Sequence, residues 1–255
     1  MRVAAWAAPV EPEAEEKRLE RLARTAAAAA AEGARLLVLP EEGALAPSPQ
    51  GAPSRAAEPS DGPLARALAA IARAHRIALL AGYREACSGR VYSAALLIDA
   101  EGIGLANYRR THLTAAERTA GLAAGAWLSV AALAGHRLGI LIGADLHVPE
   151  VARALVLSGA EALCVLGARA PQRASLLEPL LAARAIENGV PVVHAGWATA
   201  DGVGARILAP DGAVRAQARE PGGLAIATLD PPERLRAGLA ERRPRLYVSL
   251  VAEED

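Results

Sequence analysis

Two amino acids are almost missing from this 255-residue chain, which contains no phenylalanine and only one lysine, Lys17. Every other long cationic side chain is an arginine, which we attribute to a composition biased toward alanine and arginine. The formal net charge at pH 7 is zero, and no basic block occurs. A nucleic-acid-binding or membrane-surface protein usually carries excess positive charge. We therefore expect neither nucleic acid nor a membrane as a partner.

Cysteine is also scarce: only Cys87 and Cys164 occur, and two cysteines make no disulfide scaffold. No apolar run reaches the length that spans a bilayer, and acidic residues follow the short apolar start, unlike a signal peptide. These absences favour a cytoplasmic protein. No cysteine and histidine positions have zinc-ligand spacing, so we expect no metal and no cofactor.

What the chain does contain is 53% hydrophobic and 22% charged residues, enough for a single globular α/β domain over residues 1–255. Short apolar runs bounded by turn residues predict strands, and apolar residues at helical spacing predict helices. The expected strands are 2–7, 35–39, 77–81, 91–99, 103–108, 128–133, 137–142, 160–166, 191–195, 205–209, 213–217 and 224–229. The expected helices are 13–32, 61–74, 149–159, 173–188 and 231–239, with a loop at 43–60 and an extended tail at 242–250.

The most informative stretch is 138–150, where an apolar strand runs into a sharp turn and then a helix that starts at Pro149. Many hydrolases hold a nucleophile at such a turn, because it exposes one side chain beside backbone N–H groups that can stabilise an oxyanion. The residue at the turn is Gly143, which has no side chain. The sequence therefore predicts the turn of a nucleophile elbow without its nucleophile.

Charged residues follow two other predicted strands. Glu41 comes directly after strand 35–39, where it is either at the rim of a site or a solvated loop acid. Arg109 and Arg110 follow strand 103–108 and are either a surface charge pair or an anion site. Both interpretations stay open at this point.

Taken together, these segments resemble the nitrilase, or carbon–nitrogen hydrolase, superfamily over nearly the whole chain. The segments that carry the resemblance are 33–41, 91–99, 108–113, 139–150, 183–188, 210–212 and 242–247, in this order. The resemblance implies an α-β-β-α sandwich. It also implies that the protein pairs into an α-β-β-α-α-β-β-α homodimer or a larger homo-oligomer.

Members of this superfamily use a cysteine thiolate that attacks an amide or nitrile carbon. A glutamate acts as general base, a lysine stabilises the tetrahedral intermediate, and a second glutamate often positions the substrate. The resemblance places Glu41 at the general-base position and Glu117 at the second-glutamate position. Arg110 stands at the lysine position and Gly143 at the cysteine position. Two members of the expected triad have therefore changed.

No other residue is an evident replacement nucleophile. Cys164 lies in an apolar strand and is expected in the core, and Cys87 is expected to be an exposed thiol in a polar loop. Asp145 and His147 flank the turn and are expected to be capping and loop groups.

These substitutions lead to two functional hypotheses. The first is a pseudoenzyme in which Glu41, Glu117 and Arg110 form a buried ion cluster. It would bind a small amide-, nitrile- or carboxylate-like ligand, or serve as an assembly subunit. The second is an active amidohydrolase that cleaves a non-peptide C–N bond without cysteine, with Glu41 activating water directly.

Overall fold

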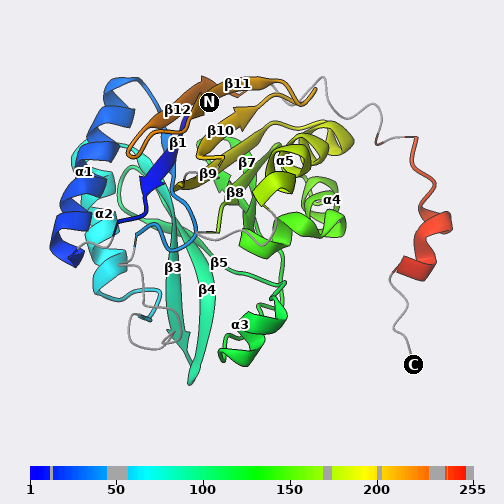
Figure 1. Cartoon of the computed structure of the whole chain (residues 1–255), viewed down its shortest axis with the longest axis horizontal. Helices are drawn as coiled ribbons and strands as arrows, with labels where there is room; N and C mark the ends of the chain where they lie inside the picture. The colour runs from blue at the N-terminus through cyan, green and yellow to red at the C-terminus, as the bar shows by residue number, and fades with distance from the viewer. Residues whose placement is uncertain are drawn as a thin grey trace.

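Two layers of strands lie between two pairs of helices in the computed structural model (Figure 1). The structure describes residues 1–11, 14–44, 57–168, 174–199, 203–229, 239 and 241–250. The strands are β1 (Arg2–Pro9), β2 (Leu36–Val38), β3 (Ala78–Cys87), β4 (Arg90–Ile98), β5 (Gly104–Arg109), β6 (Val130–Leu133), β7 (His136–Ile142), β8 (Ala162–Leu166), β9 (Val192–Ala198), β10 (Ala205–Leu208), β11 (Val214–Ala218) and β12 (Leu224–Thr228). The helices are α1 (Glu15–Ala31), α2 (Pro63–His75), α3 (Ala115–Thr119), α4 (Pro149–Leu157) and α5 (Ala174–Asn188), with short 3₁₀ helices η1 (Gly143–His147) and η3 (Pro244–Leu250).

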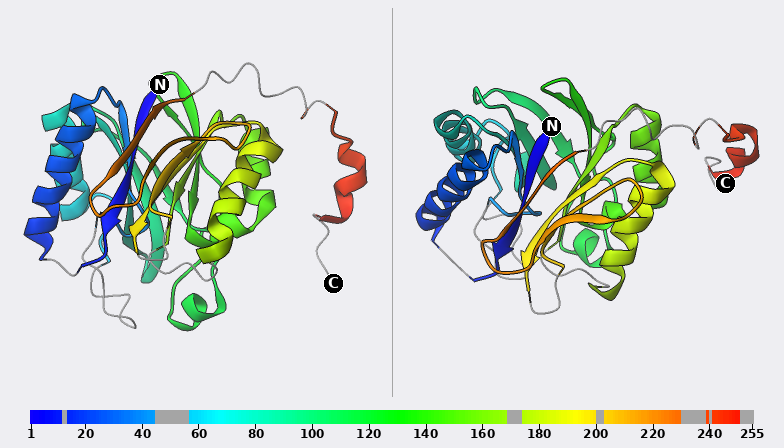
Figure 2. Two further views of the ribbon diagram at one scale, coloured as in Figure 1. Left: turned by 45° about the horizontal axis from the view of Figure 1, so that its top comes forward. Right: turned by 90° about the horizontal axis from the view of Figure 1, so that it is seen from above.

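The strands follow one hydrogen-bonded path, in the order β5-β4-β3-β2-β1-β9-β8-β7-β6. The path passes from one layer to the other at β1 and β9, where Ala7 pairs with Gly196. Strand β12 adds to β1, and the β10–β11 hairpin adds to β9. Helices α1 and α2 cover one layer and α4 and α5 cover the other, which gives the α-β-β-α sandwich that the sequence predicted (Figure 2).

Alternation along the strands divides the core into three parts, because successive side chains point to opposite faces of a sheet. In β1, Val3 and Ala5 pack between the two layers, whereas Ala4 and Trp6 pack under α1 and α2. A third cluster lies under α4 and α5. Within the described ranges, no helix is both long and apolar enough to cross a membrane.

Strand direction brings the predicted site residues to one edge. Strands β1, β2 and β3 are mutually parallel, as are β7, β8 and β9, and β1 is parallel to β9. Strand β5 runs in the same direction, because both β3–β4 and β4–β5 are antiparallel pairs. The residues that follow β2, β5 and β7 therefore meet at the carboxyl edge of the sheets.

Two expectations about local structure need correction, and two others fall partly or largely outside the described residues. Cys87 is not in a polar loop: β3 continues well beyond residue 81, and Cys87 is its last residue, half-buried beside the Ser88–Gly89 turn. The segment 244–250 is a 3₁₀ helix rather than an extended tail. The expected loop 43–60 lies partly outside the described residues, and the expected helix 231–239 lies outside them except for Leu239.

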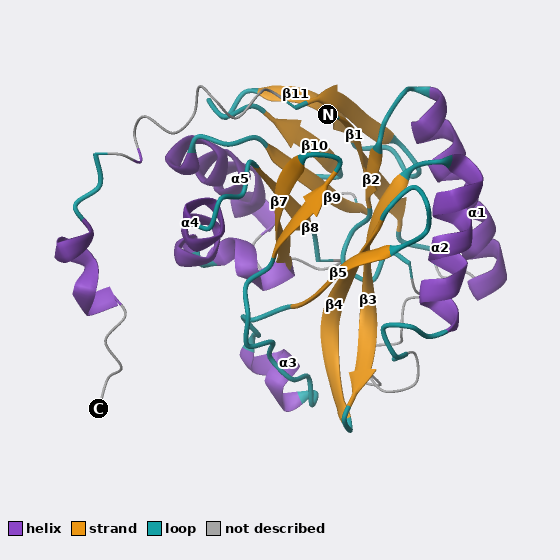
Figure 3. Cartoon of the chain, turned by 180° about the vertical axis from the view of Figure 1, so that it is seen from behind, coloured by secondary structure: helices purple, strands orange, loops and turns teal. Residues whose placement is uncertain are grey.

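The β3–β4 hairpin was missed because residues 82–87 lack clear alternation of apolar and polar side chains. Its two strands pair from Leu79 with Ile98 to Cys87 with Arg90. The far end of this hairpin and helix α3 extend beyond the two layers on the same side of the molecule (Figure 3).

Candidate functional site

Glu41 lies in the turn after β2 and points into the carboxyl edge of the sheets. Its backbone N–H donates to the carbonyl oxygen of Gly167 over 3.1 Å, which ties this turn to the end of β8. Gly82 in β3 allows the close approach, because a β-carbon there would stand 2.6 Å from the Pro40 carbonyl oxygen. Glu41 is therefore buried, and the solvated-loop interpretation of this residue is wrong.

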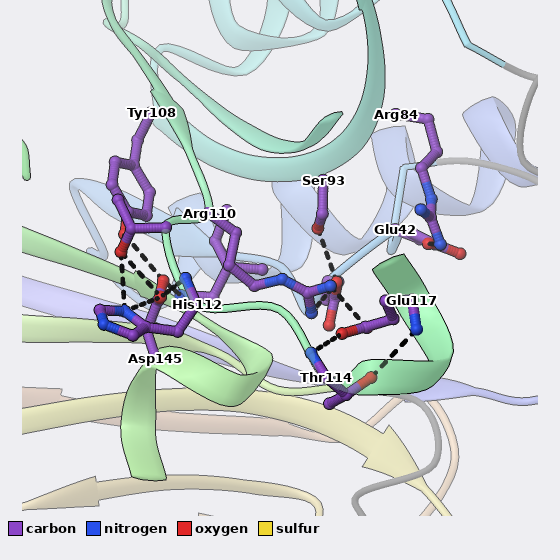
Figure 4. Close-up of polar contacts among 12 residues, drawn as sticks. Glu42, Arg84, Ser93, Tyr108, Arg110, His112, Thr114, Glu117 and Asp145 are labelled. Atoms are coloured by element: carbon purple, nitrogen blue, oxygen red, sulfur yellow. Dashed lines mark hydrogen bonds and ion pairs between the residues drawn. The ribbon is translucent and has the colours of Figure 1, made fainter. Parts of the chain in front are cut away.

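Arg110 follows β5 and joins two carboxylates from different elements. Its Nη1 lies 2.8 Å from Oε1 of Glu41, and its Nη2 lies 2.5 Å from Oε1 of Glu117. The arginine side chain is 1% exposed, so it is not a surface charge. We call Glu41, Arg110 and Glu117 the Arg110 cluster (Figure 4).

Burial and pairing oppose each other in this cluster. Burial raises the pKa of Glu41, and the Arg110 guanidinium only partly offsets the shift. Burial disfavours the charge of Arg110, but Glu41 and Glu117 outweigh it and raise the pKa of Arg110 overall. Burial also acts on Glu117, where Arg110 and the Thr114 N–H outweigh it and lower the pKa.

Glu117 is positioned by the first turn of α3. The Thr114 hydroxyl accepts a hydrogen bond from the Glu117 N–H, and the Glu117 carboxylate accepts one from the Thr114 N–H. This reciprocal capping box explains why so short a helix forms here. One carboxylate oxygen caps the helix while the other faces Arg110.

Ser93 also belongs to this site, and the sequence analysis did not identify it. Its hydroxyl donates to Oε1 of Glu41 over 2.6 Å from a fully buried position in β4. The Ser93 carbonyl accepts the Arg110 N–H over 2.8 Å, so one residue contacts both ends of the ion pair. The available signal was Ser93 itself, because the other residues of the run 91–98 are apolar or aromatic.

Gly143 begins η1 in a left-handed conformation, with φ of +49°. A β-carbon on Gly143 would stand 2.6 Å from Oε2 of Glu41 and 2.9 Å from Nη1 of Arg110. The Arg110 cluster therefore closes around the place where a side chain at this turn would begin. The glycine itself is half-exposed, so the turn reaches solvent.

Asp145 lies within η1, is fully buried and stabilises the turn through its carboxylate. Its Oδ2 accepts hydrogen bonds from the Tyr108 hydroxyl at 2.8 Å and the Ile142 N–H at 3.1 Å. Its Oδ1 accepts from the Thr111 hydroxyl at 3.1 Å and the His112 N–H at 3.0 Å (Figure 4). The expected capping role of Asp145 is present, together with a link from the turn to the segment after β5.

His112 was not singled out from the sequence. Its Nδ1 lies 3.3 Å from Asp145, and this contact raises the pKa of His112. His147, which was singled out, is exposed at the end of η1. Arg109 points away from Arg110, donates two hydrogen bonds to the buried Glu85 and stacks on a tyrosine ring.

The two cysteines lie in different environments, and both are free. Cys164 is fully buried between the sheets, as the sequence predicted, and burial raises the pKa of its thiol to about 12. Cys87 lies at the far end of the β3–β4 hairpin. Within the described ranges, no three His, Cys, Asp or Glu side chains gather closely enough to hold a metal ion.

Comparison with known proteins places this geometry in a family. The family model described as carbon-nitrogen hydrolase matches residues 2–236. A Pseudomonas protegens protein described as "Hydrolase in pqqF 5'region" is 38% identical over 206 residues, covering 76% of this chain and 72% of that protein. An "(R)-stereoselective amidase" from Pseudomonas sp. is 33% identical over 135 residues, covering 53% of this chain and 48% of that protein.

A solved structure shows the same fold. A mutant of the amidase from Nesterenkonia sp. AN1 aligns with a TM-score of 0.83 and 27% identity, over 98% of this chain and 100% of that one. In that protein acrylamide has added to the active-site cysteine. This chain has glycine at the turn where the resemblance places that residue.

Proposed function

This chain belongs to the carbon–nitrogen hydrolase family, and we propose that it is a member without covalent catalysis, a pseudoenzyme whose site binds a small polar ligand. One observation carries the proposal. Gly143 has no side chain and therefore no nucleophile. The Nη1 atom of Arg110 lies 2.9 Å from the point where a β-carbon on residue 143 would stand. Losing the nucleophile of a hydrolase removes a factor on the order of 10⁶ in rate.

No described side chain close to the turn is a good substitute for cysteine. Cys164 is a buried thiol whose raised pKa disfavours the reactive thiolate. Ser93 contacts the general-base position, but it is fully buried, and its hydroxyl proton is already directed to Glu41. These observations support the absence of a covalent intermediate.

Hydrolysis by water is the second candidate, and the environment of Glu41 favours it. Burial raises the pKa of this carboxyl group, which is the direction expected of a general base. Against it, Glu41 already accepts hydrogen bonds from Ser93 and Arg110, and both reduce its basicity. We therefore place water-based hydrolysis second.

The deciding experiment measures ammonia release from a panel of small amides and nitriles. We expect no turnover by the parent chain or by Gly143→Cys alone, because Arg110 would crowd the new β-carbon. The double variant Gly143→Cys with Arg110→Lys replaces the forked guanidinium by a single ammonium group. We expect activity only in this double variant, and we expect Glu41→Gln to abolish it.

The alternative outcomes are equally informative. Ammonia release by the parent chain, lost in Glu41→Gln, contradicts the pseudoenzyme proposal and favours water as nucleophile. If no variant releases ammonia and circular dichroism shows that each one is folded, the site has been remodelled for binding or assembly to an extent that two substitutions do not reverse.

We also propose that the chain forms a homodimer or larger homo-oligomer in a reducing, cytoplasmic environment. Leu157, Leu176 and Ile186 are exposed on the outer helix layer of α4 and α5, which supports an interface there. Analytical ultracentrifugation tests this proposal. We expect Leu176→Glu to shift the mass toward the monomer and Leu105→Glu, at an exposed leucine on β5, to leave it unchanged.

A further inference from the structure

We propose that the Arg110 cluster selects small cations that donate N–H hydrogen bonds, such as an amidinium or a primary ammonium, and rejects carboxylates. This inference deepens the proposed function and rests on it, because a covalent reaction at this turn would impose different demands on the ligand. The sequence suggested that Arg110 could receive a carboxylate. The contacts of Arg110 argue for the opposite charge.

The first argument is that both outer nitrogens of Arg110 already lie against carboxylates. Nη1 contacts Glu41 at 2.8 Å and Nη2 contacts Glu117 at 2.5 Å. The remaining N–H groups of Arg110, including an Nε without a hydrogen-bond partner, are covered by protein, because the side chain is 1% exposed. A carboxylate ligand could therefore reach the guanidinium only by displacing Glu41 or Glu117. Displacement would leave a carboxylate without its partner, which is costly in a desolvated site.

The second argument is charge. With both carboxylates ionised, the Arg110 cluster carries one excess negative charge. The neighbouring basic groups do not reverse this sign: Arg84 is paired with Glu42, and His112 lies against Asp145. A cation is attracted to such a cluster, and an anion of the same shape is repelled.

The third argument is which atoms a ligand would meet. Glu117 is 27% exposed, whereas Arg110 is almost completely covered. Glu41 takes the hydrogen bonds of Ser93 and Arg110 on Oε1, and its Oε2 faces the half-exposed turn, 2.6 Å from the β-carbon point of Gly143. Among the described residues, no donor reaches this Oε2. The side-chain atoms nearest the turn and at the partly exposed Glu117 therefore include carboxylate oxygens, which are hydrogen-bond acceptors and fit N–H donors.

Three ligands of nearly identical shape separate the possibilities: propionamidinium, propionamide and propionate, which are cationic, neutral and anionic at pH 8. We would measure their dissociation constants by isothermal titration calorimetry at low salt. We expect the amidinium to bind about tenfold more tightly than the amide, and the carboxylate to show no binding.

A charge variant with a matched control tests the cause. Glu117→Gln keeps the shape of the side chain and removes the excess charge, so the tenfold preference for the amidinium should disappear. Glu101→Gln removes an exposed carboxylate from a turn between β4 and β5 and should leave the preference unchanged. If Glu117→Gln does not fold, a salt titration of the parent chain tests the same cause. Raising the ionic strength should weaken the binding of the amidinium and leave the affinity for the amide unchanged.

Propionate binding as tightly as the amidinium overturns this inference, and so does equal binding of all three ligands. Absence of binding by all three also overturns it, while the pseudoenzyme proposal stands as long as no ammonia is released. Ammonia release from amides contradicts the proposed function without changing the order of the three affinities. The two failures are therefore distinguishable.

Discussion

The Nη1 atom of Arg110 lies 2.9 Å from the point where a β-carbon on Gly143 would stand. The two residues are complementary in size. The guanidinium of Arg110 occupies the space next to residue 143, and the side chain of any residue larger than glycine there would enter the same space. Arginine rather than lysine at position 110 fits the composition of a chain with one lysine. Glycine at position 143 has a spatial reason that composition bias does not supply.

This complementarity predicts that Gly143→Ala destabilises the fold. The new methyl group would stand 2.6 Å from Glu41 Oε2, and the backbone φ of +49° is strained for alanine. We expect a loss of about 3 kcal/mol in the free energy of unfolding, measured by urea denaturation. Gly135→Ala is the matched control, since Gly135 has φ of +82° with nothing within 4 Å of its β-carbon point. It should lose only about 1 kcal/mol.

Equal losses in the two glycine variants would mean that backbone strain, rather than contact with the Arg110 cluster, limits position 143. In the Arg110→Ala background, the extra cost of Gly143→Ala should shrink, because one of its two close contacts is gone.

Ser93→Ala should weaken the buried ion pair. It removes the 2.6 Å hydrogen bond to Glu41 and leaves a buried carboxylate with one donor fewer. We expect a loss of about 2 kcal/mol by thermal or urea denaturation. Ser158→Ala, at an exposed serine after α4, should change stability by less than about 0.5 kcal/mol. A loss at Ser93 no larger than at Ser158 would contradict this account.

Asp145→Asn should be among the most damaging conservative substitutions. An amide in place of the carboxylate would turn N–H donors toward hydrogens of Tyr108, Ile142, Thr111 or His112. We expect a loss of about 3 kcal/mol in the free energy of unfolding. Asp99→Asn changes a carboxylate that accepts two backbone N–H groups in an exposed turn, and its loss should stay below about 1 kcal/mol.

Two histidines predict opposite effects of pH on stability. Burial lowers the pKa of His194 from 6.5 to about 4, so the unfolded chain takes up this proton first as pH falls. His194 should therefore make the protein less stable as pH drops from about 6.5 to 4, by up to roughly 3 kcal/mol. His194→Gln should remove this part of the slope in urea denaturation series at several pH values.

His112 has the opposite sign, because the Asp145 contact raises its pKa in the folded state. The stabilisation that His112 contributes to the folded state is present at low pH and is lost as pH rises through its pKa in the folded protein. The effect should be small, since the side chain is 43% exposed and solvent screens the pair. A steeper acid slope in His112→Gln than in the parent chain supports this assignment, and a shallower slope contradicts it.

Much of the fold was predictable because its signals are local. Apolar runs indicated most strands, and Pro149 and Gly159 bracket helix α4 as expected. The β3–β4 hairpin was not found, because its outer half carries mixed polar residues whose exposure depends on how far the ribbon extends past the layers. The 3₁₀ helix at 244–250 was not predicted, because its apolar residues do not recur at the spacing of an α-helix.

The candidate site was predictable as a set of residues and not as a geometry. Glu41, Glu117, Arg110 and Gly143 were assigned to one site by the resemblance of the sequence to the family, which gives no distances between them. Ser93 and His112 were not identified, because each is an ordinary polar residue whose contacts depend on neighbours 52 and 33 positions away in the chain.

The sequence by itself determined that residue 143 has no nucleophile, because glycine lacks a side chain in any fold. It also determined most of the helices and strands, because hydrophobic periodicity and turn residues act over a few positions. Only the tertiary structure decided that Arg110 is buried between two carboxylates, that both its outer nitrogens lie against glutamates, and that Oε2 of Glu41 lies close to the turn. Those facts depend on parallel strands, which bring the segments after β2, β5 and β7 to one edge of the sheets. The distances between the charged side chains and their removal from water at this edge determine which ligand charge is favoured.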